Sequence, residues 1–397
     1  MKYGFPTRDQ QQWFSFLPFV VMVFILPFPG TVAVRLICLV FCVAIALRGW
    51  RSRSVPGLPC HRAIALWAIV SIVSLAYAID FRYSAGEIKN EVGYALLTFA
   101  AFFVCTRDES RLRWVLASVV ASGVVISLWA LGLRFLTGYW DESARHGGTG
   151  AYGSLSVVLM PVVLCLWFLW PRARPVWAVA GLLTVAAAYF SYQRAVWPIF
   201  AVEALLAAFL LARRYRIAPN RRIRLNAAVA IAILFACGGW FAQGAKVSSY
   251  GNAAAIDRDS RVVLWPAVAR TIIEHPISGA GFGREAMKLG YPELLVPDHP
   301  HFWHAHNVFL NYGLAMGLAG LAVLIVLFSS IFIRFLRLST DRENQASIIG
   351  LTGALLVLAL VLRNLTNDFF VRDAALLFWA LCGALFGAGL REKARQR

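Results

Sequence analysis

The residues best suited to chemistry lie in one polar stretch, Ser248 to Leu310, of a chain that is otherwise mostly apolar. Four of the seven histidines fall in it: His299, His301, His304 and His306. Four arginines precede them: Arg258, Arg261, Arg270 and Arg284. Histidine exchanges a proton near neutral pH, and arginine binds phosphate oxygens through paired N–H donors. Together these residue types indicate chemistry on a phosphorylated substrate.

The histidine run admits three interpretations. It could form an interfacial belt with the neighbouring aromatic residues, one histidine could act as a general base, or several could bind a metal. Its HxxHxH spacing differs from zinc-enzyme patterns such as HExxH. His306 and Asn307 precede an apolar run that contains Gly313, Gly317 and Gly320, so we expect them to open a closely packed helix. His304 is expected to point elsewhere.

The composition predicts an all-α polytopic membrane protein. Of 397 residues, 60% are hydrophobic and 15% are charged, against about 25% charged in a soluble domain. The apolar runs are near 20 residues long, which favours helical spans over the short alternating strands of a β-barrel. The seven cysteines form no CxxC pair, so neither a disulfide framework nor a thiolate metal site is expected.

We expect about twelve transmembrane helices and one large loop. Residues 1–243 carry spans one to nine, residues 244–307 form the loop, and residues 308–397 carry spans ten to twelve and a tail. The expected spans are residues 14–29, 31–48, 63–79, 92–105, 114–137, 152–170, 176–192, 196–212, 226–243, 313–336, 347–362 and 374–390. No small-residue cleavage pattern follows the first span, so we expect it to remain as an anchor.

The charge distribution predicts the orientation. The net charge is +18, and the dense arginine clusters follow the even-numbered spans or lie at the termini. The positive-inside rule therefore places both termini in the cytoplasm and the large loop on the periplasmic side of a bacterial inner membrane. The excess charge also attracts anionic membrane lipids, and part of it could bind an anionic substrate. No basic soluble domain exists to bind nucleic acid.

Three polar positions outside the loop share its expected side. Arg194 lies in a very short junction between spans seven and eight, where a charge is costly unless it is paired or serves a site. Lys89 belongs to the polar stretch before span four, and Asp368 to the last outward turn, where it could orient a histidine. Within the loop we expect a helix from Ser260 to about Glu274, then a glycine-rich turn at 275–283 whose N–H groups could cradle an anion.

These features resemble the O-antigen ligase and polymerase superfamily of bacterial envelope glycosyltransferases. The matching pieces are Tyr192-Gln193-Arg194, Ser260-Arg261 through Trp265, His275-Pro276 through Gly283, and His304-Ala305-His306-Asn307 leading to Gly320. The span pattern, with one large loop between spans nine and ten, is similar to that of the ligases. The turn here reads Gln193-Arg194-Ala195, whereas the family often has Ser-Arg-Gly.

The resemblance implies a GT-C-like architecture and a glycosyl transfer. A ligase moves polysaccharide from undecaprenyl pyrophosphate to a sugar hydroxyl of lipid A-core, with inversion and without a metal or other cofactor. His306 would be the general base, and Arg194 and Arg261 would bind the pyrophosphate. Lys89 would be a further phosphate contact. The residues expected to support the site are Asn307, His304 and Asp368.

Two other functions remain open. An O-antigen polymerase would use a second lipid-linked glycan as acceptor, but polymerases usually show two sizeable periplasmic loops. A lipid-linked sugar flippase would carry several charged groups at mid-depth and internal repeats, whereas Glu203 is nearly alone inside the predicted spans.

Overall fold

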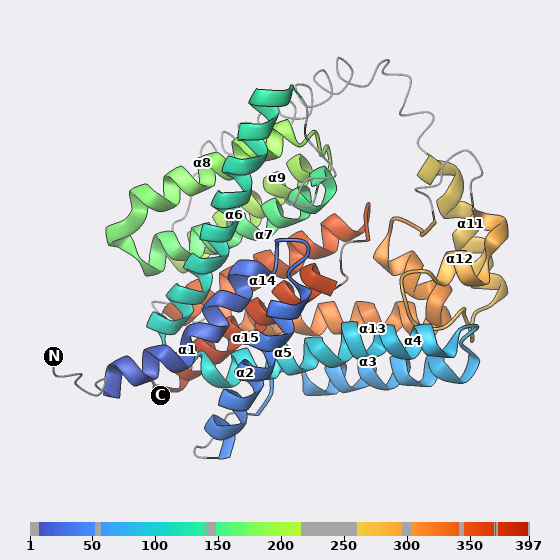
Figure 1. Ribbon diagram of the computed structural model, residues 1–397, viewed down its shortest axis with the longest axis horizontal. Coiled ribbons are helices and arrows are strands. Elements are labelled where there is room, and N and C mark those ends of the chain that lie inside the picture. Colours follow the sequence, from blue (N-terminus) through green and yellow to red (C-terminus); the bar gives the residue numbers. More distant parts are fainter. Residues whose placement is uncertain are drawn as a thin grey trace.

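The computed structural model describes residues 8–51, 57–138, 140, 148–215, 260–295, 303–340, 345–368, 370 and 372–395. Within these ranges the chain forms helices and no strands (Figure 1). The α-helices are α1 (Arg8–Ile25), α2 (Val32–Arg51), α3 (His61–Val73), α4 (Phe81–Glu87), α5 (Tyr94–Cys105), α6 (Glu109–Thr137), α7 (Gly148–Leu169), α8 (Arg174–Phe190), α9 (Val196–Arg214), α11 (Ser260–Glu274), α12 (Ala286–Gly290), α13 (Val308–Ser339), α14 (Gln345–Asn364) and α15 (Arg372–Arg395). Four short helices complete the set: η1 (Ser74–Tyr77), η2 (Ile88–Gly93), η3 (Pro171–Ala173) and η5 (Pro292–Leu294).

The predicted class of all-α polytopic membrane protein is confirmed. In the described part of the chain, nine helices are long and apolar enough to cross a membrane, and two shorter apolar helices begin at Ser15 and His61. Predicted span nine, residues 226–243, lies outside the described residues, so the total of twelve stays a prediction. Eleven of the twelve predicted spans thus coincide with an apolar helix.

The polar stretch before span four is helical, which differs from the predicted outward junction. α4, η2 and α5 run on as one segment, Phe81–Cys105. Asp80 starts it by accepting a hydrogen bond from Tyr83 N at 2.9 Å. η2 is a π-helical turn, and such turns often occur at functional sites. The side chains of Glu87 and Glu91 are buried here, so this surface faces protein.

The centre of the bundle consists of α14 and α15. Of their most apolar segments, 78% and 83% are buried, compared with 22% for α9 and 28% for α8, which lie at the periphery. α15 packs on α5 and α14 packs on α13 and α7. In Figure 1, α1 begins and α15 ends at the left, whereas α11 and α12 lie at the right. The polar segment with the candidate chemistry is therefore remote from these two helix ends.

The predicted loop helix is confirmed as α11, and the glycine-rich turn after it docks onto a break in α13. Met316 and Gly317 leave the helical conformation, and Gly317 has a φ of 65°. Ala280 N and Gly281 N donate to Leu314 O and Ala315 O, each at 3.0 Å, and Leu318 N donates to Pro276 O at 2.9 Å. The turn thus satisfies backbone groups that the break frees, as irregular backbone at membrane depth requires.

This docking decides between two interpretations of the glycines. The N–H groups of Ala280 and Gly281 bind α13, and Phe282 N donates to Ser74 Oγ at 3.2 Å. These three donors are therefore unavailable to an anion, and the cradle interpretation is wrong for them. The predicted close packing holds, because a Cβ on Gly313 would lie 2.5 Å from Ile272 of α11.

We predict that Gly317→Ala lowers the free energy of unfolding by about 2 kcal/mol or more, since it adds left-handed strain and a steric clash. The new Cβ would lie 2.6 Å from Pro276 O. Thermal unfolding of the detergent-solubilised protein measures the effect. Gly132→Ala is the control, because a Cβ at Gly132 of α6 meets no atom within 4 Å. Equal stability of the two variants would contradict the docking role.

Candidate functional site

His306 stands immediately before the first residues of α13 and is fixed by its neighbours. Asn307 caps the helix: its Oδ1 accepts from Phe309 N at 2.9 Å and Leu310 N at 3.2 Å, as expected for a helix start. His306 itself has a φ of 48°, in the left-handed region that non-glycine residues seldom adopt. Such strained positions persist only where surrounding contacts hold them, and they cluster at functional sites.

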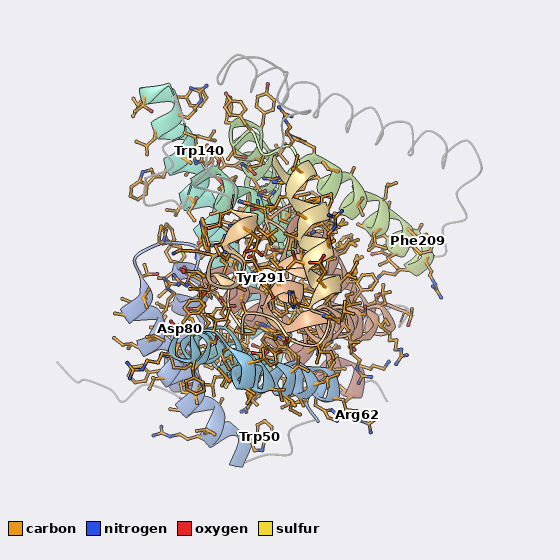
Figure 2. The ribbon with its side chains drawn as sticks, turned by 90° about the vertical axis from the view of Figure 1, so that its right-hand side faces the viewer. Trp50, Arg62, Asp80, Trp140, Phe209 and Tyr291 are labelled. Atoms are coloured by element: carbon orange, nitrogen blue, oxygen red, sulfur yellow. The ribbon has the colours of Figure 1, made fainter. Side chains whose placement is uncertain are left out.

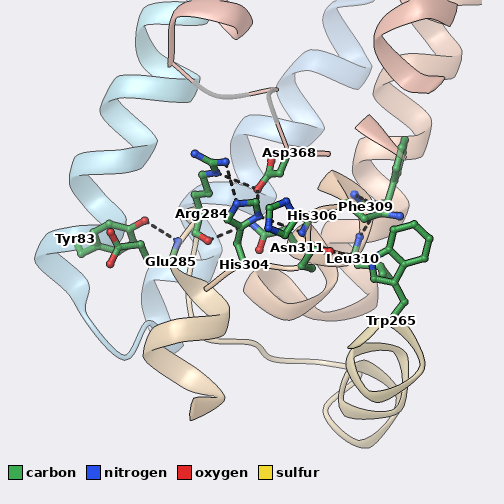
Figure 3. A network of polar contacts seen from close by, with 12 residues as sticks. Tyr83, Trp265, Arg284, Glu285, His304, His306, Phe309, Leu310, Asn311 and Asp368 are labelled. Carbon is green, nitrogen blue, oxygen red and sulfur yellow. Dashed lines mark hydrogen bonds and ion pairs between the residues drawn. The ribbon is translucent and has the colours of Figure 1, made fainter. Parts of the chain in front are cut away.

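The contact that holds His306 comes from His304. His306 N–H donates to His304 Nδ1 at 3.1 Å, and the two ring centroids are 4.0 Å apart at an angle of 38°. Figure 3 shows the two imidazoles side by side. The expectation that His304 points elsewhere is therefore wrong. The left-handed conformation of His306 turns the chain back, so the two side chains here lie against each other with tilted rings.

Arg284 and Asp368 complete the cluster from two distant parts of the chain (Figure 3). Arg284 Nη2 lies 3.0 Å from His304 Nε2, and Arg284 Nε lies 3.5 Å from Asp368 Oδ2. Asp368 Oδ2 is also 3.8 Å from His304 Nδ1, and its side chain is 1% exposed. The supporting positions predicted for His304 and Asp368 agree with this geometry, although their role stays a prediction.

The sequence does not single out Arg284, which is one of four loop arginines and has no predicted role in the site. The side chain is half-buried, its charge lies 4.9 Å from the centre of the Trp303 ring, and its carbonyl accepts from Asn311 Nδ2 at 3.5 Å. No local pattern distinguishes Arg284 from Arg270, which is exposed on α11. The position just after the docked glycine-rich turn is the signal that could have found it.

The environment keeps His304 neutral. Burial lowers its pKa to about 2, and the charges of His306, Arg284 and Arg261 add to that shift. His304 Nδ1 accepts the His306 N–H, which leaves the single ring proton of the neutral imidazole on Nε2, and a second proton would have to face the donor at Nδ1. Below pH 6.5, this histidine binds a proton in the unfolded chain but not in the folded protein. The contribution of His304 to stability is therefore full above pH 6.5 and declines as the pH falls.

The contribution of Asp368 to stability depends on pH in the opposite direction. Burial raises its pKa to about 6, while the nearby Arg284 guanidinium opposes the shift. At neutral pH the carboxylate is mostly ionised and pairs with Arg284. Since its folded pKa lies above the ordinary 3.8, its contribution to stability is present at low pH and is lost as the pH rises through 6. Between about pH 4 and 6 the pH-dependent contributions of His304 and Asp368 to stability therefore partly cancel.

α11 brings Arg261 to the histidine pair. Trp265 Nε1 donates to Ala305 O at 2.9 Å, which fixes this helix against the segment between the two histidines. Arg261 is four residues before Trp265 and so lies on the same helix face. Its charge contributes to the lowered pKa of His304 and also reaches Arg363 of α14. The contact of Trp265 thus places the helix that carries Arg261 against the segment that carries the predicted base.

Arg194 occupies the tight turn between α8 and α9, as predicted. The residue is half-buried, and its Nε is buried without a hydrogen-bond partner in the described part of the chain. Tyr192 has a φ of 54°, and its hydroxyl accepts from Arg134 Nη2 at 3.0 Å. In this turn Tyr192 is left-handed, whereas Ala195, at the position where the family often has glycine, has a φ of −65° that any residue can adopt.

Lys89 and the metal interpretation receive no support from the contacts. Lys89 is exposed on η2, and the network of Figure 3 does not include it. Over the described ranges, no group of three or more His, Cys, Asp and Glu side chains converges as metal ligands. His299 and His301 lie outside the described residues, so a metal site that used them is not tested.

We predict that Arg284→Met lowers the free energy of unfolding by about 3 kcal/mol, because it leaves the buried Asp368 carboxylate uncompensated. Arg270→Met, on the exposed face of α11, should change it by less than about 0.5 kcal/mol. Chemical unfolding in detergent measures both. Adding Asp368→Asn to Arg284→Met should restore stability. Strictly additive effects would show that the two side chains do not interact.

Comparison with known proteins bears on this arrangement. Residues 179–325 match a family model described as O-antigen ligase. The matched segment contains Arg194, Arg261, Arg284, His304 and His306, and it extends from α8 past the break in α13. No curated protein matches the chain.

Proposed function

We propose that this chain, which carries an O-antigen ligase family segment over residues 179–325, is an O-antigen ligase. It would transfer a polysaccharide from undecaprenyl pyrophosphate to a sugar hydroxyl of lipid A-core. The site would lie on the periplasmic side of the bacterial inner membrane, with both termini in the cytoplasm and a GT-C-like arrangement of spans. Two lipid-anchored substrates explain why such a site belongs at a membrane surface.

One observation carries this proposal: the hydrogen bond from Trp265 to Ala305 holds the face of α11 that bears Arg261 against the segment between His304 and His306. A pyrophosphate is already a good leaving group, so the protein needs to position two substrates, stabilise the growing negative charge and accept one proton. Arginine suits the second task and histidine the third. The match to the O-antigen ligase family supports the class of reaction, and the roles of the individual residues are part of the proposal.

In the proposed reaction, the acceptor hydroxyl oxygen attacks the anomeric carbon from the face opposite the pyrophosphate. A new C–O bond forms, and the bond to the pyrophosphate oxygen breaks with its electron pair moving onto that oxygen. The configuration therefore inverts. His306 accepts the hydroxyl proton, while Arg194 and Arg261 bind the departing pyrophosphate, with Lys89 as a further phosphate contact. Nδ1 of His306 is buried, so the base role falls to Nε2.

His304 would support the base without titrating. Because it stays neutral, it accepts the His306 N–H and keeps the base in its left-handed conformation. A protonated His304 would instead repel the imidazolium that forms on His306 during proton transfer. Arg284 and Asp368 fix the His304 ring, and Asn307 fixes the helix start.

We predict that His306→Ala lowers the transfer rate at least 100-fold, which is the lower range for loss of a general base. The assay uses purified protein with lipid-pyrophosphate glycan and lipid A-core. His275→Ala is the matched control, since His275 lies exposed at the end of α11 and should leave transfer unchanged. A fully active His306→Ala protein with an unchanged fold would reject the base assignment.

Arg261 and Arg270 form a second matched pair, because both lie on α11. Arg261→Ala should lower kcat/KM for the donor about 100-fold or more, as for the loss of one stabilising group on a developing charge. Arg270→Ala should change it less than about twofold, because Arg270 is exposed. Kinetics with varied donor distinguish the two. Similar losses of kcat/KM for both variants would show that Arg261 acts only through the general positive charge of α11.

Metal independence belongs to the proposal and has its own experiment. We expect transfer to continue after thorough chelation, since arginines can stabilise the leaving group's charge in place of a metal. Loss of activity that a divalent ion restores would instead support a metal site that includes His299 or His301.

An O-antigen polymerase is the second candidate, because family membership does not separate the two acceptors. The short α8–α9 turn favours the ligase, since polymerases usually carry a sizeable loop there. A flippase is less well supported: Glu203 is a buried carboxyl inside α9, but a charged path across the bundle would need several such groups at mid-depth.

A further inference from the structure

Arg363, which none of the proposed roles uses, is buried at the end of a central helix. Its side chain belongs to the last turn of α14, and only 2% of the residue is exposed. A guanidinium within a membrane bundle is costly unless it is hydrogen-bonded and serves a site. The end of a helix reduces that cost, because the last carbonyls carry partial negative charge.

The guanidinium joins α14 to α7 and to the α8–α9 turn. Arg363 Nε donates to Ser154 Oγ at 3.1 Å, and Nη2 donates to Gly150 O at 3.2 Å and to Gln193 Oε1 at 3.0 Å. Arginine only donates, so the carbonyl oxygen of Gln193 must face it, and the Gln193 amide nitrogen then meets Thr149 Oγ1 at 3.3 Å. Gln193 is thereby held on both sides.

Close packing prevents other positions of these two side chains. A Cβ on Gly153 of α7 would lie 2.9 Å from Gln193 Cγ and 3.1 Å from Arg363 Nη2. The glycine makes room for the pair to lie flat against α7. The Gln193 carbonyl also accepts from Val196 N, the first residue of α9, at 3.1 Å. The direction of Arg194 follows from the placement of Gln193, its neighbour in the chain.

The segment that begins at Arg363 and ends at Asp368 also contacts the histidine side of the site. Leu365 O, two residues after Arg363, accepts from Asn307 Nδ2 at 3.0 Å. Asp368, three residues further, pairs with Arg284. The segment from Arg363 to Asp368 therefore contacts both the turn that carries Arg194 and the segment that carries His306, which are more than 100 residues apart in the sequence.

We propose that Arg363 is a positioning residue that fixes Arg194, through Gln193, at a set distance from His306. The proposal rests on the proposed function, because it gives Arg194 the pyrophosphate. Arg363 touches neither substrate in this account. It acts on the donor side, so its loss should weaken use of the donor and leave the KM for the acceptor unchanged.

Hydrogen–deuterium exchange tests the contact without any assumption about activity. Arg363→Met and Gln193→Ala should each raise amide exchange in residues 191–197 at least fivefold. Gln193→Glu retains an acceptor for Arg363 and should keep the turn protected. Arg391→Met is the matched control: Arg391 also donates to backbone carbonyls in the bundle, to Phe103 O at 2.9 Å and Gly387 O at 2.7 Å, but near the other end of α15. Unchanged exchange in both Arg363→Met and Gln193→Ala would overturn the proposal.

Transfer kinetics test whether the contact acts through Arg194. Arg363→Met should lower kcat/KM for the lipid-pyrophosphate donor at least tenfold in the wild-type background, and less than twofold in an Arg194→Ala background. A tenfold loss from Arg363→Met that persists in the Arg194→Ala background, or a raised KM for the acceptor, would overturn the proposal. If Arg363→Met does not fold, Gln193→Ala takes its place in both backgrounds. A wild-type protein that transfers nothing, with the exchange results as expected, would reject the proposed function and leave the contact standing.

Discussion

The buried pair of Arg284 and Asp368 is the interaction on which the rest of the site depends. The Asp368 side chain is 1% exposed, so its carboxylate needs a cation nearby. Arg284 supplies that cation. Because Arg284 meets both Asp368 and His304, one side chain links the loop, the last connector and the segment before α13. His304 then holds His306 in a conformation that the chain would not adopt alone.

The break in α13 explains how a polar loop can sit so close to a bundle. At Met316 and Gly317 the helix opens, and the glycine-rich turn completes the backbone hydrogen bonds that the opening leaves. The docked turn also places Arg284, which is the next residue in the chain. Trp265 fixes α11 by a separate hydrogen bond to Ala305. Two separate attachments thus orient α11 and the glycine-rich turn against α13 and the segment before it.

Much of this arrangement was predictable from local patterns. Apolar length identified the spans, the helix at Ser260–Glu274 and the helix start at Asn307 agree with the structure, and the family resemblance singled out Arg194, Arg261 and His306. Contacts between distant segments were not predictable. Local sequence does not reveal which distant side chains Arg284 and Arg363 meet, and the left-handed conformation of His306, which places its ring beside that of His304, has no sequence signature. The polar stretch before span four also continues as a helix into that span, because Glu87 and Glu91 are buried against other helices.

The central claim is that a base and arginines at one membrane surface transfer a glycan from a lipid pyrophosphate to lipid A-core. Reconstitution of the purified protein in vesicles, with labelled lipid-pyrophosphate glycan and both possible acceptors present, tests it most directly. The account predicts label on lipid A-core, with inverted anomeric configuration and release of undecaprenyl pyrophosphate. Label that accumulates only in a longer lipid-linked glycan would contradict it and identify a polymerase.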